Sequence, residues 1–289
     1  MFMKLANFLI KMRRSKWSSA IKSIVPERLR RAAWNVVAKE NEFQVLGSRM
    51  VIPESCRMPD LILDIYEPQV TACLKFLLKP GMIFCDVGAN LGVFTLFAAK
   101  LVGPKGHVFA FEPVPSNFHA LKHNVEINNQ ANVTCISKAV AETNGVSKLY
   151  LSDYNGSHSL IDNPAAFSGI VIDVKTVRLD SLEGLNHIDV LKIDVEGFEL
   201  QVIRSLGSLK PIIILEYFSE RISRSGLDGI AFISELKALG YLSLYNLSNP
   251  EVGIEPIIQN QDVVVNLLAS TQKIPGFKGI NLLTNTFTS

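Results

Sequence analysis

The sequence contains few cysteines and no pattern that would join them. Only four are spread over 289 residues, with no CxxC pair and no histidine partner close by. A zinc site or a disulfide framework is therefore not expected, and reduced thiols suit the cytoplasm. The sequence also lacks an apolar run of about twenty residues, the length that a membrane-spanning helix needs. Residues 1–10 are too short for the core of a signal peptide, so we expect a cytoplasmic protein.

The sequence also has little net charge, +2 over the whole chain, which gives no general attraction to nucleic acid. Residues 1–45 are an exception, because ten Lys and Arg residues stand there among few acids. Phe2, Leu5 and Leu9 share one helical face of this segment. Two interpretations stay open: a basic amphipathic extension that makes a peripheral contact with anionic lipid at the inner face of the membrane, or a helical extension packed on the main domain. Pro26 allows at most two helical pieces.

From residue 68 onward, apolar strand-like runs alternate with segments of helical periodicity. This alternation predicts an α/β fold with a Rossmann-like, seven-stranded, mostly parallel sheet covered by helices on both faces. The expected strands are 82–87, 107–111, 133–137, 188–193 and 212–217, with 241–245 and 262–268 as an antiparallel edge pair; the expected helices are 68–78, 91–101, 115–128, 196–206 and 227–239. The polar residues 146–178 predict a hairpin-like insertion. We expect a helical extension over 1–45 and one α/β domain over 46–289.

The most informative segment is the turn Asp86-Val87-Gly88-Ala89-Asn90-Leu91-Gly92, which follows an apolar strand and opens a helix. Gly88 and Gly92 lack the side chains that would keep a ligand away from the backbone. Such a turn holds either the pyrophosphate of a dinucleotide or the amino-acid end of S-adenosylmethionine. Asp86 favours a ligand with a positive ammonium group over one with phosphates, and this carboxylate tips the prediction towards methyl transfer.

A second acidic position follows the next strand, which ends in Phe111-Glu112-Pro113. In nucleotide-binding α/β folds, a carboxylate at this place accepts hydrogen bonds from the ribose hydroxyls. The glycine turn and Glu112 follow adjacent strands, so both are expected at one crevice at the carboxyl edge of the sheet. Pro113 stiffens the exit from the strand, which suits a fixed edge of a ligand site. The alternative is a solvated carboxylate at a strand end.

Three carboxylates gather where the fourth strand ends: Asp194, Glu196 and Glu199. Helix N-termini stabilise anions, so Glu196 and Glu199 have a structural explanation. Asp194 is still at the strand end and is expected to point into the crevice. There it could accept a proton from a hydroxyl, orient a substrate or bind a metal. Lys192 in a buried strand needs a partner, which Asp194 or Glu216 could supply.

Two further residues are candidates for catalysis beside Asp194. Glu216 ends the fifth strand and therefore reaches the same edge of the sheet. His158 lies in the polar segment 155–159, which could cover the crevice, although a lone loop histidine is more often incidental than catalytic. The predicted catalytic residues are thus Asp194, Glu216 and His158. From these residues alone, the sequence does not show whether the reaction needs a metal ion.

Four segments in this order resemble the FkbM-type S-adenosylmethionine-dependent methyltransferases: 86–92, 111–113, 174–180 and 191–199. The resemblance implies the class I methyltransferase fold, S-adenosylmethionine as the cofactor, and O-methylation of a sugar hydroxyl in a glycan or natural product. It also implies a donor site lined by Asp86, Gly88, Asn90 and Glu112, to which the two turns add Gly92 and Pro113 as candidate residues. The acceptor, a small molecule or glycan, would lie beside residues 194–199 and Glu216.

Other functions are disfavoured by what these segments lack. Dehydrogenases usually carry a GxGxxG turn, which 88–92 does not match, and no tyrosine is followed four residues later by lysine. A nucleic-acid base methyltransferase would show an Asn-Pro-Pro or Asp-Pro-Pro clamp, whereas the fourth strand exits into residues 194–197 without proline. A non-catalytic, membrane-attached binding module is the remaining alternative. The basic residues 1–45 support it, and the complete set of donor-site motifs opposes it.

Overall fold

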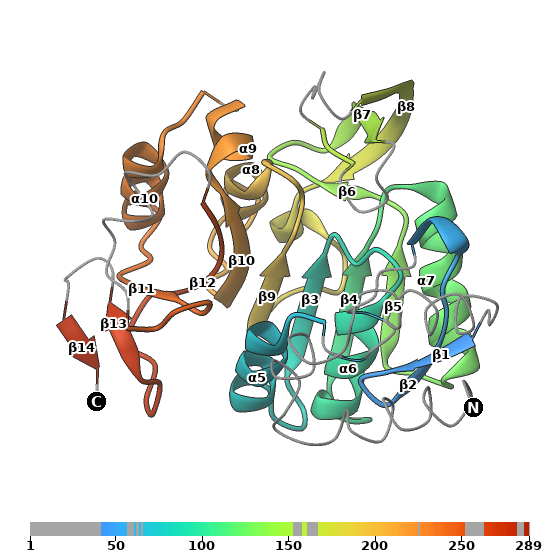
Figure 1. Ribbon diagram of the computed structural model, residues 1–289, viewed down its shortest axis with the longest axis horizontal. Coiled ribbons are helices and arrows are strands. Elements are labelled where there is room, and N and C mark those ends of the chain that lie inside the picture. Colours follow the sequence, from blue (N-terminus) through green and yellow to red (C-terminus); the bar gives the residue numbers. More distant parts are fainter. Residues whose placement is uncertain are drawn as a thin grey trace, which may run out of the picture.

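The structure, a computed structural model, describes residues 42–56, 61, 64, 66–152, 158–160, 167–224, 226–251, 263–281 and 286–288. Its central feature is a seven-stranded sheet in the order β11-β12-β10-β9-β3-β4-β5 (Figure 1). The strands are β3 (Ile83–Val87), β4 (His107–Phe111), β5 (Val133–Ile136), β9 (Val190–Ile193), β10 (Ile212–Phe218), β11 (Ser243–Asn246) and β12 (Val264–Ser270).

Within this sheet, β12 runs antiparallel to both of its neighbours, and the other paired strands are parallel. The predicted α/β fold with a mostly parallel sheet and an antiparallel edge pair is therefore confirmed. The strand order reverses between β3 and β9, because the chain continues from β3 to β4 on one side and returns to β9 on the other. Ligands of open α/β sheets bind beyond the carboxyl ends of the strands at such a reversal.

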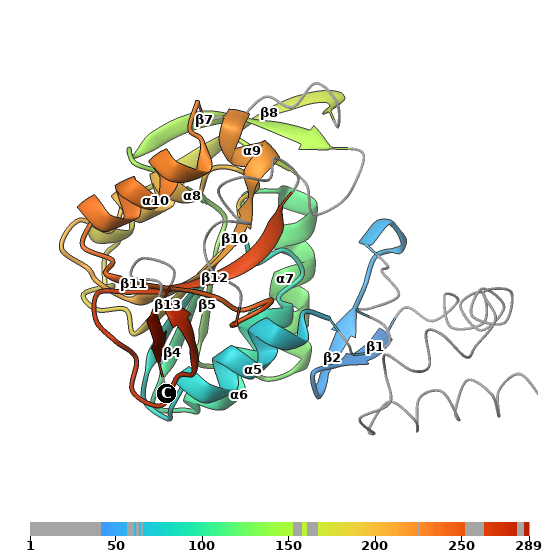
Figure 2. The same ribbon diagram turned by 60° about the vertical axis from the view of Figure 1, so that its left-hand side comes forward.

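Helices cover both faces of the sheet (Figures 1 and 2). One face carries α5 (Pro68–Leu77), α6 (Val93–Val102) and α7 (Pro115–Ile127); the other carries α8 (Glu199–Arg204) and α10 (Gly229–Ala238). Successive residues of a strand point to opposite faces. Phe84 accordingly packs with the apolar residues of α5 and α6, and Cys85 with those of α8 and α10. A further short helix, α9 (Ser219–Arg224), follows β10 directly.

Smaller sheets flank this core. They are formed by β1 (Glu42–Val45) and β2 (Ser48–Val51), by β6 (Ala139–Val140), β7 (Gly145–Ser152) and β8 (Phe167–Val177), and by β13 (Gly279–Asn281) and β14 (Thr286–Thr288); the 3₁₀ turns are η1 (Glu54–Cys56) and η2 (Leu179–Ser181). The hairpin of β7 and β8 projects beyond the carboxyl ends of the parallel strands (Figure 1). It is the insertion that the polar composition of residues 146–178 predicts.

The described residues that precede the central sheet differ from the predicted helical extension. Residues 42–45, expected at the end of a helical extension, form β1 instead. Residues 1–41 lie outside the described residues, so the extension and its contact with a membrane stay predictions. Among the helices that the structure describes, none combines the length and the apolar composition needed to span a bilayer.

Candidate active site

A cavity of about 280 Å³ opens at the carboxyl ends of β3, β4, β9 and β10. Eight of the nine predicted site residues line it: Asp86, Gly88, Asn90, Glu112, Pro113, His158, Asp194 and Glu216. Parallel strands end at the same edge of a sheet, which explains why segments more than a hundred residues apart meet here. Gly92 is the exception, because it does not line the cavity.

The two glycines of the turn allow close packing, Gly88 against backbone and Gly92 against a side chain. Gly88 has a φ of +83°, and a Cβ added there would overlap the carbonyl oxygen of Asp194. Gly92 has a φ of +90°, and its added Cβ would lie 2.7 Å from Cδ1 of Leu121. The explanation from the sequence, that both glycines make room for a ligand, is therefore corrected for Gly92, whereas for Gly88, which lines the cavity, it stays a prediction. Gly88 lets β3 lie against the exit of β9, and Gly92 lets the turn pack on α7.

Asp86 lies beneath the turn and is only 1% exposed. Its Oδ2 accepts a hydrogen bond of 2.6 Å from the hydroxyl of Thr95, whereas Oδ1 has no partner among the described residues. Lys192 is its direct neighbour across the paired strands. Burial raises the pKa of Asp86, and the positive charge of Lys192 opposes this effect. A buried carboxylate oxygen without a partner is a strong acceptor for a donor group of a ligand.

Glu112 joins the turns after β3 and β4. Its Oε2 accepts a hydrogen bond of 2.8 Å from the backbone N–H of Asn90, and its Oε1 accepts one of 2.9 Å from that of Val114. Burial raises the pKa of Glu112 to about 7 despite these bonds. Each carboxylate oxygen retains a second lone pair that a ribose hydroxyl could use. Asn90 itself has a φ of 49°, and its Oδ1 is buried without a partner in the described part of the chain.

Lys192 connects the glycine turn with the acidic end of β9. Its Nζ donates to Oδ2 of Asp194 at 3.0 Å and lies 5.0 Å from the centre of the Phe94 ring. Burial would lower the pKa of Lys192, but the negative charges of Asp194 and Asp86 outweigh it and hold the pKa above the usual range. The sequence offers two partners for Lys192, namely Asp194 and Glu216. The structure shows the pairing with Asp194.

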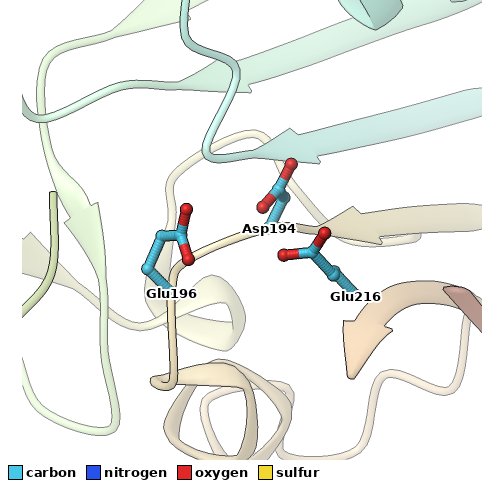
Figure 3. Close-up of side chains that lie close together, drawn as sticks. All are labelled: Asp194, Glu196 and Glu216. Atoms are coloured by element: carbon cyan, nitrogen blue, oxygen red, sulfur yellow. The ribbon is translucent and has the colours of Figure 1, made fainter. Parts of the chain in front are cut away.

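Three carboxyl groups, those of Asp194, Glu196 and Glu216, turn toward a common space (Figure 3). One oxygen of each lies within 4.8 Å of the others, a spacing that suits oxygen ligands of a divalent cation. However, the guanidinium group of Arg221 pairs with Glu196 and lies 3.7 Å from Glu216. The cluster therefore contains its own counter-cation, and we assign no metal to it.

The carboxyl groups of this cluster differ in their surroundings. Burial, reinforced by the charges of Asp194 and Glu67, raises the pKa of Glu216 to about 8. A carboxyl group with a pKa near neutrality can exchange a proton with a substrate. Glu196 has a φ of 61° and stands before the helix, which begins at Glu199. The explanation of Glu196 as a residue of the helical N-terminus is therefore corrected, whereas Glu199 is in the first turn and its Oε1 accepts from Gly197 N–H at 2.9 Å.

His158 lines the cavity from the side of the β7–β8 hairpin. Its Nδ1 accepts a hydrogen bond of 2.9 Å from the backbone N–H of Ser152, and burial lowers its pKa. The neutral ring then carries its proton on Nε2. In this arrangement the Nε2–H is the donor group of the ring, and a catalytic role of His158 stays a prediction.

Three residues of this region are not among those that the sequence predicts. Tyr66 and Glu67 stand at the start of α5 and line the cavity, and Arg221 comes from α9. Pro68 marks the start of a helix, but no local pattern shows that this start faces the end of β9. The helices that the sequence predicts do not include α9, so no role is expected for its arginine.

Residues 86–243, more than half of the chain, match the family model described as "Methyltransferase FkbM domain". The match begins at Asp86 and includes the glycine turn, Glu112, Asp194 and Glu216. This chain belongs to the FkbM methyltransferase family. The resemblance carried by the four short segments is thereby confirmed.

Curated relatives agree with this membership. The chain is 26% identical over 142 residues to Methyltransferase 1 of Beauveria bassiana, a match that covers 42% of this chain and 57% of that protein. It is 31% identical over 157 residues to the 31-O-demethyl-FK506 methyltransferase FkbM of Streptomyces tacrolimicus, covering 44% and 60%. It is 30% identical over 134 residues to the hexuronic acid methyltransferase AglP of Haloferax volcanii, covering 43% and 49%. The chain thus spans about half of the length of these relatives.

Proposed function

We propose that this FkbM-family protein binds S-adenosylmethionine in the cavity and transfers its methyl group to a hydroxyl of a carbohydrate or glycosylated natural product. The observation that carries the proposal is the meeting of Asp86, Asn90 and Glu112 at one cavity, beyond the point where the strand order reverses. Two of them, Asp86 and Asn90, each keep a buried oxygen that has no partner within the described residues.

The donor groups of S-adenosylmethionine fit these acceptors. Its ammonium group can donate to the free Oδ1 of Asp86, and its ribose hydroxyls can donate to the remaining lone pairs of Glu112. The cofactor supplies a methyl group that is electrophilic because it is bound to a sulfonium. The residues of the chain then have two tasks, which are to align the acceptor hydroxyl and to take its proton.

Asp194 and Glu216 are the carboxylates that we assign to the acceptor side of the cavity. Lys192 holds Asp194 through the bond of 3.0 Å, which favours an orienting role for Asp194. Glu216, with a pKa of about 8, is better suited to accept the proton of a hydroxyl as the oxygen attacks. We assign to His158 a hydrogen bond from Nε2–H to an acceptor oxygen.

The choice of an oxygen acceptor is supported by the relatives' names. One relative acts on 31-O-demethyl-FK506, and another is a hexuronic acid methyltransferase. A hydroxyl needs a proton acceptor in the transition state, and carboxylates stand at the cavity. Because the chain covers only part of each relative, the identity of the acceptor must come from experiment.

The first test is a calorimetric titration of the protein with S-adenosylhomocysteine. Asn90→Gly removes the amide, and glycine suits the φ of 49° at this position. We expect micromolar binding to the wild type and about five- to tenfold weaker binding to the variant, the effect of one lost hydrogen bond. Asn129→Gly is the matched control, because Asn129 has a φ of 53° and is exposed at the end of α7.

Two results would contradict the proposal. A folded wild-type protein that does not bind S-adenosylhomocysteine is not a methyltransferase of this kind. Equal affinity of the wild type and Asn90→Gly would place the ligand away from the glycine turn. Once binding is shown, transfer of a labelled methyl group to a panel of glycans identifies the acceptor.

A further inference from the structure

One face of the sheet carries a row of charged side chains at its carboxyl edge. Asp86 on β3 and Lys192 on β9 are register partners, and Glu216 lies two residues beyond Ile214, the partner of Lys192 on β10. All three point to the face that α5 and α6 cover, since strand side chains alternate and Ile214 packs in that core. Asp194 adds a fourth charge through its bond to Lys192.

Glu67, which precedes α5, lines the same cavity as this row of side chains. It is the N-cap of α5 and has φ 39° and ψ 65°, a left-handed conformation that is unfavourable for a residue with a side chain. Burial raises the pKa of Glu67, and the positive charge of Lys192 opposes this effect. The Tyr66 ring packs 5.8 Å from that of Phe94, and all of these side chains line the cavity.

The charges at this place do not balance. In the described part of the chain, five carboxyl groups meet only two cations, the ammonium of Lys192 and the guanidinium of Arg221. The five are those of Glu67, Asp86, Asp194, Glu196 and Glu216. The unpartnered Oδ1 of Asp86, in a side chain that is 99% buried, is an independent sign that a donor or cation belongs in this cavity. Burial and mutual repulsion raise the pKa of Glu67, Asp86 and Glu216, so a positively charged ligand in this cavity would favour their ionised forms.

We propose that Glu67 selects the sulfonium of S-adenosylmethionine over the neutral thioether of S-adenosylhomocysteine. This inference rests on the proposed function. Methyl transfer breaks the S–CH₃ bond, forms an O–CH₃ bond and sends the hydroxyl proton to a carboxylate, so the donor loses one positive charge at sulfur. A fixed carboxylate that lines the cavity stabilises the donor, which carries one more positive charge, more than the product, and it therefore favours release of the product.

The test compares the affinities of the two ligands for wild-type protein and for Glu67→Gln by calorimetry. We expect the variant to bind S-adenosylmethionine about five- to tenfold more weakly, and to bind S-adenosylhomocysteine within about twofold of the wild type. Glu126→Gln is the control, because Glu126 is exposed on α7 and lies 3.9 Å from Lys122, away from the residues that line the cavity. We expect this control to change neither affinity.

A second variant guards against a failure of Glu67→Gln to fold. Glu67→Gly also removes the charge, and it suits the backbone because glycine adopts a positive φ without strain. Equal weakening of both ligands, or unchanged binding of both, would overturn the role of Glu67 and leave the proposed function standing. Failure of the wild type to bind either ligand would overturn both.

Discussion

At Gly88 two separate features require glycine. The φ of +83° disfavours any side chain, and the position of a Cβ is already taken by the carbonyl group of Asp194. The first feature is a property of the residue's own backbone, whereas the second is a contact between the ends of β3 and β9. A second glycine that has a similar φ but open space around the Cβ position shows the first effect without the second.

Gly88→Ala and Gly81→Ala make this comparison. Gly81 has a φ of +92° and no atom within 4 Å of an added Cβ. We expect Gly81→Ala to lower the free energy of unfolding by about 1–2 kcal/mol, the cost of a left-handed alanine. Gly88→Ala should lower it by at least about 3 kcal/mol, because the turn must also move away from β9. Urea denaturation measures both, and equal losses would show that the contact with Asp194 is unimportant.

Residues at strand ends were the part of the site that the sequence predicted well. Asp86, Glu112 and Asp194 directly follow or end apolar runs, and parallel strands bring such positions to one edge. Glu67 and Arg221 could not be found in this way. Their places depend on the angle at which α5 and α9 approach the sheet, which is set by tertiary packing and not by a local pattern.

At the scale of elements, helix α8 shows where periodicity fails. The sequence predicts a helix over 196–206, and the structure has one over Glu199–Arg204. The delay has a physical cause, because Glu196 and Gly197 have φ values of 61° and 101°, which no right-handed helix contains. Gly197 also approaches α9 so closely that a Cβ there would lie 2.9 Å from the carbonyl oxygen of Arg221.

The β1–β2 hairpin was missed for a different reason. Its strands have four residues each, which is too short for alternation to be recognised beside a basic, helix-like segment. Tertiary hydrogen bonds hold it to the domain. The side chain of Asn124 on α7 accepts from the backbone N–H of Val51 at 2.8 Å and donates to the carbonyl groups of Val51 and Leu91 at 3.2 and 2.9 Å. One amide thus joins the hairpin, α7 and the glycine turn.

Asn124→Ala should therefore loosen the hairpin and lower the stability of the domain. Asn124 is fully buried, so its removal leaves backbone groups without partners, at a cost of about 2–4 kcal/mol in the free energy of unfolding. Hydrogen exchange of the Val51 amide should accelerate in the same variant, because the amide loses its acceptor.

Asn128→Ala is the matched control for this element. Asn128 binds the same hairpin through the backbone N–H and carbonyl group of Arg49, but at the exposed edge. Water replaces those bonds when the side chain is lost, so we expect a cost of about 1 kcal/mol or less. A larger loss for Asn128→Ala than for Asn124→Ala would contradict the joining role of Asn124.

At the scale of the whole molecule, the site imposes a pH dependence on stability. Burial raises the pKa of Glu112 and of Glu199 to about 7, and that of Glu216 to about 8. In the unfolded chain these groups titrate near about 4.3. Between these values the folded protein binds more protons than the unfolded one, so stability falls as the pH rises. The stabilising contribution is complete below about pH 4.3 and is lost as the pH rises through 7 to 8.

We therefore expect the ligand-free protein to melt at a higher temperature at about pH 5 than at about pH 8.5, contrary to the behaviour of a protein dominated by ion-paired carboxylates. Differential scanning calorimetry across this range gives the slope. Glu112→Gln should flatten the slope, since its amide cannot titrate, whereas the exposed Glu126→Gln should leave the slope unchanged.

A positively charged ligand such as S-adenosylmethionine favours ionised carboxylates and should stabilise the protein more at pH 8.5 than at pH 5. A melting temperature that rises with pH in the free protein would mean that the carboxyl groups of the cavity are already compensated, and the case for a cationic ligand would lose its electrostatic basis.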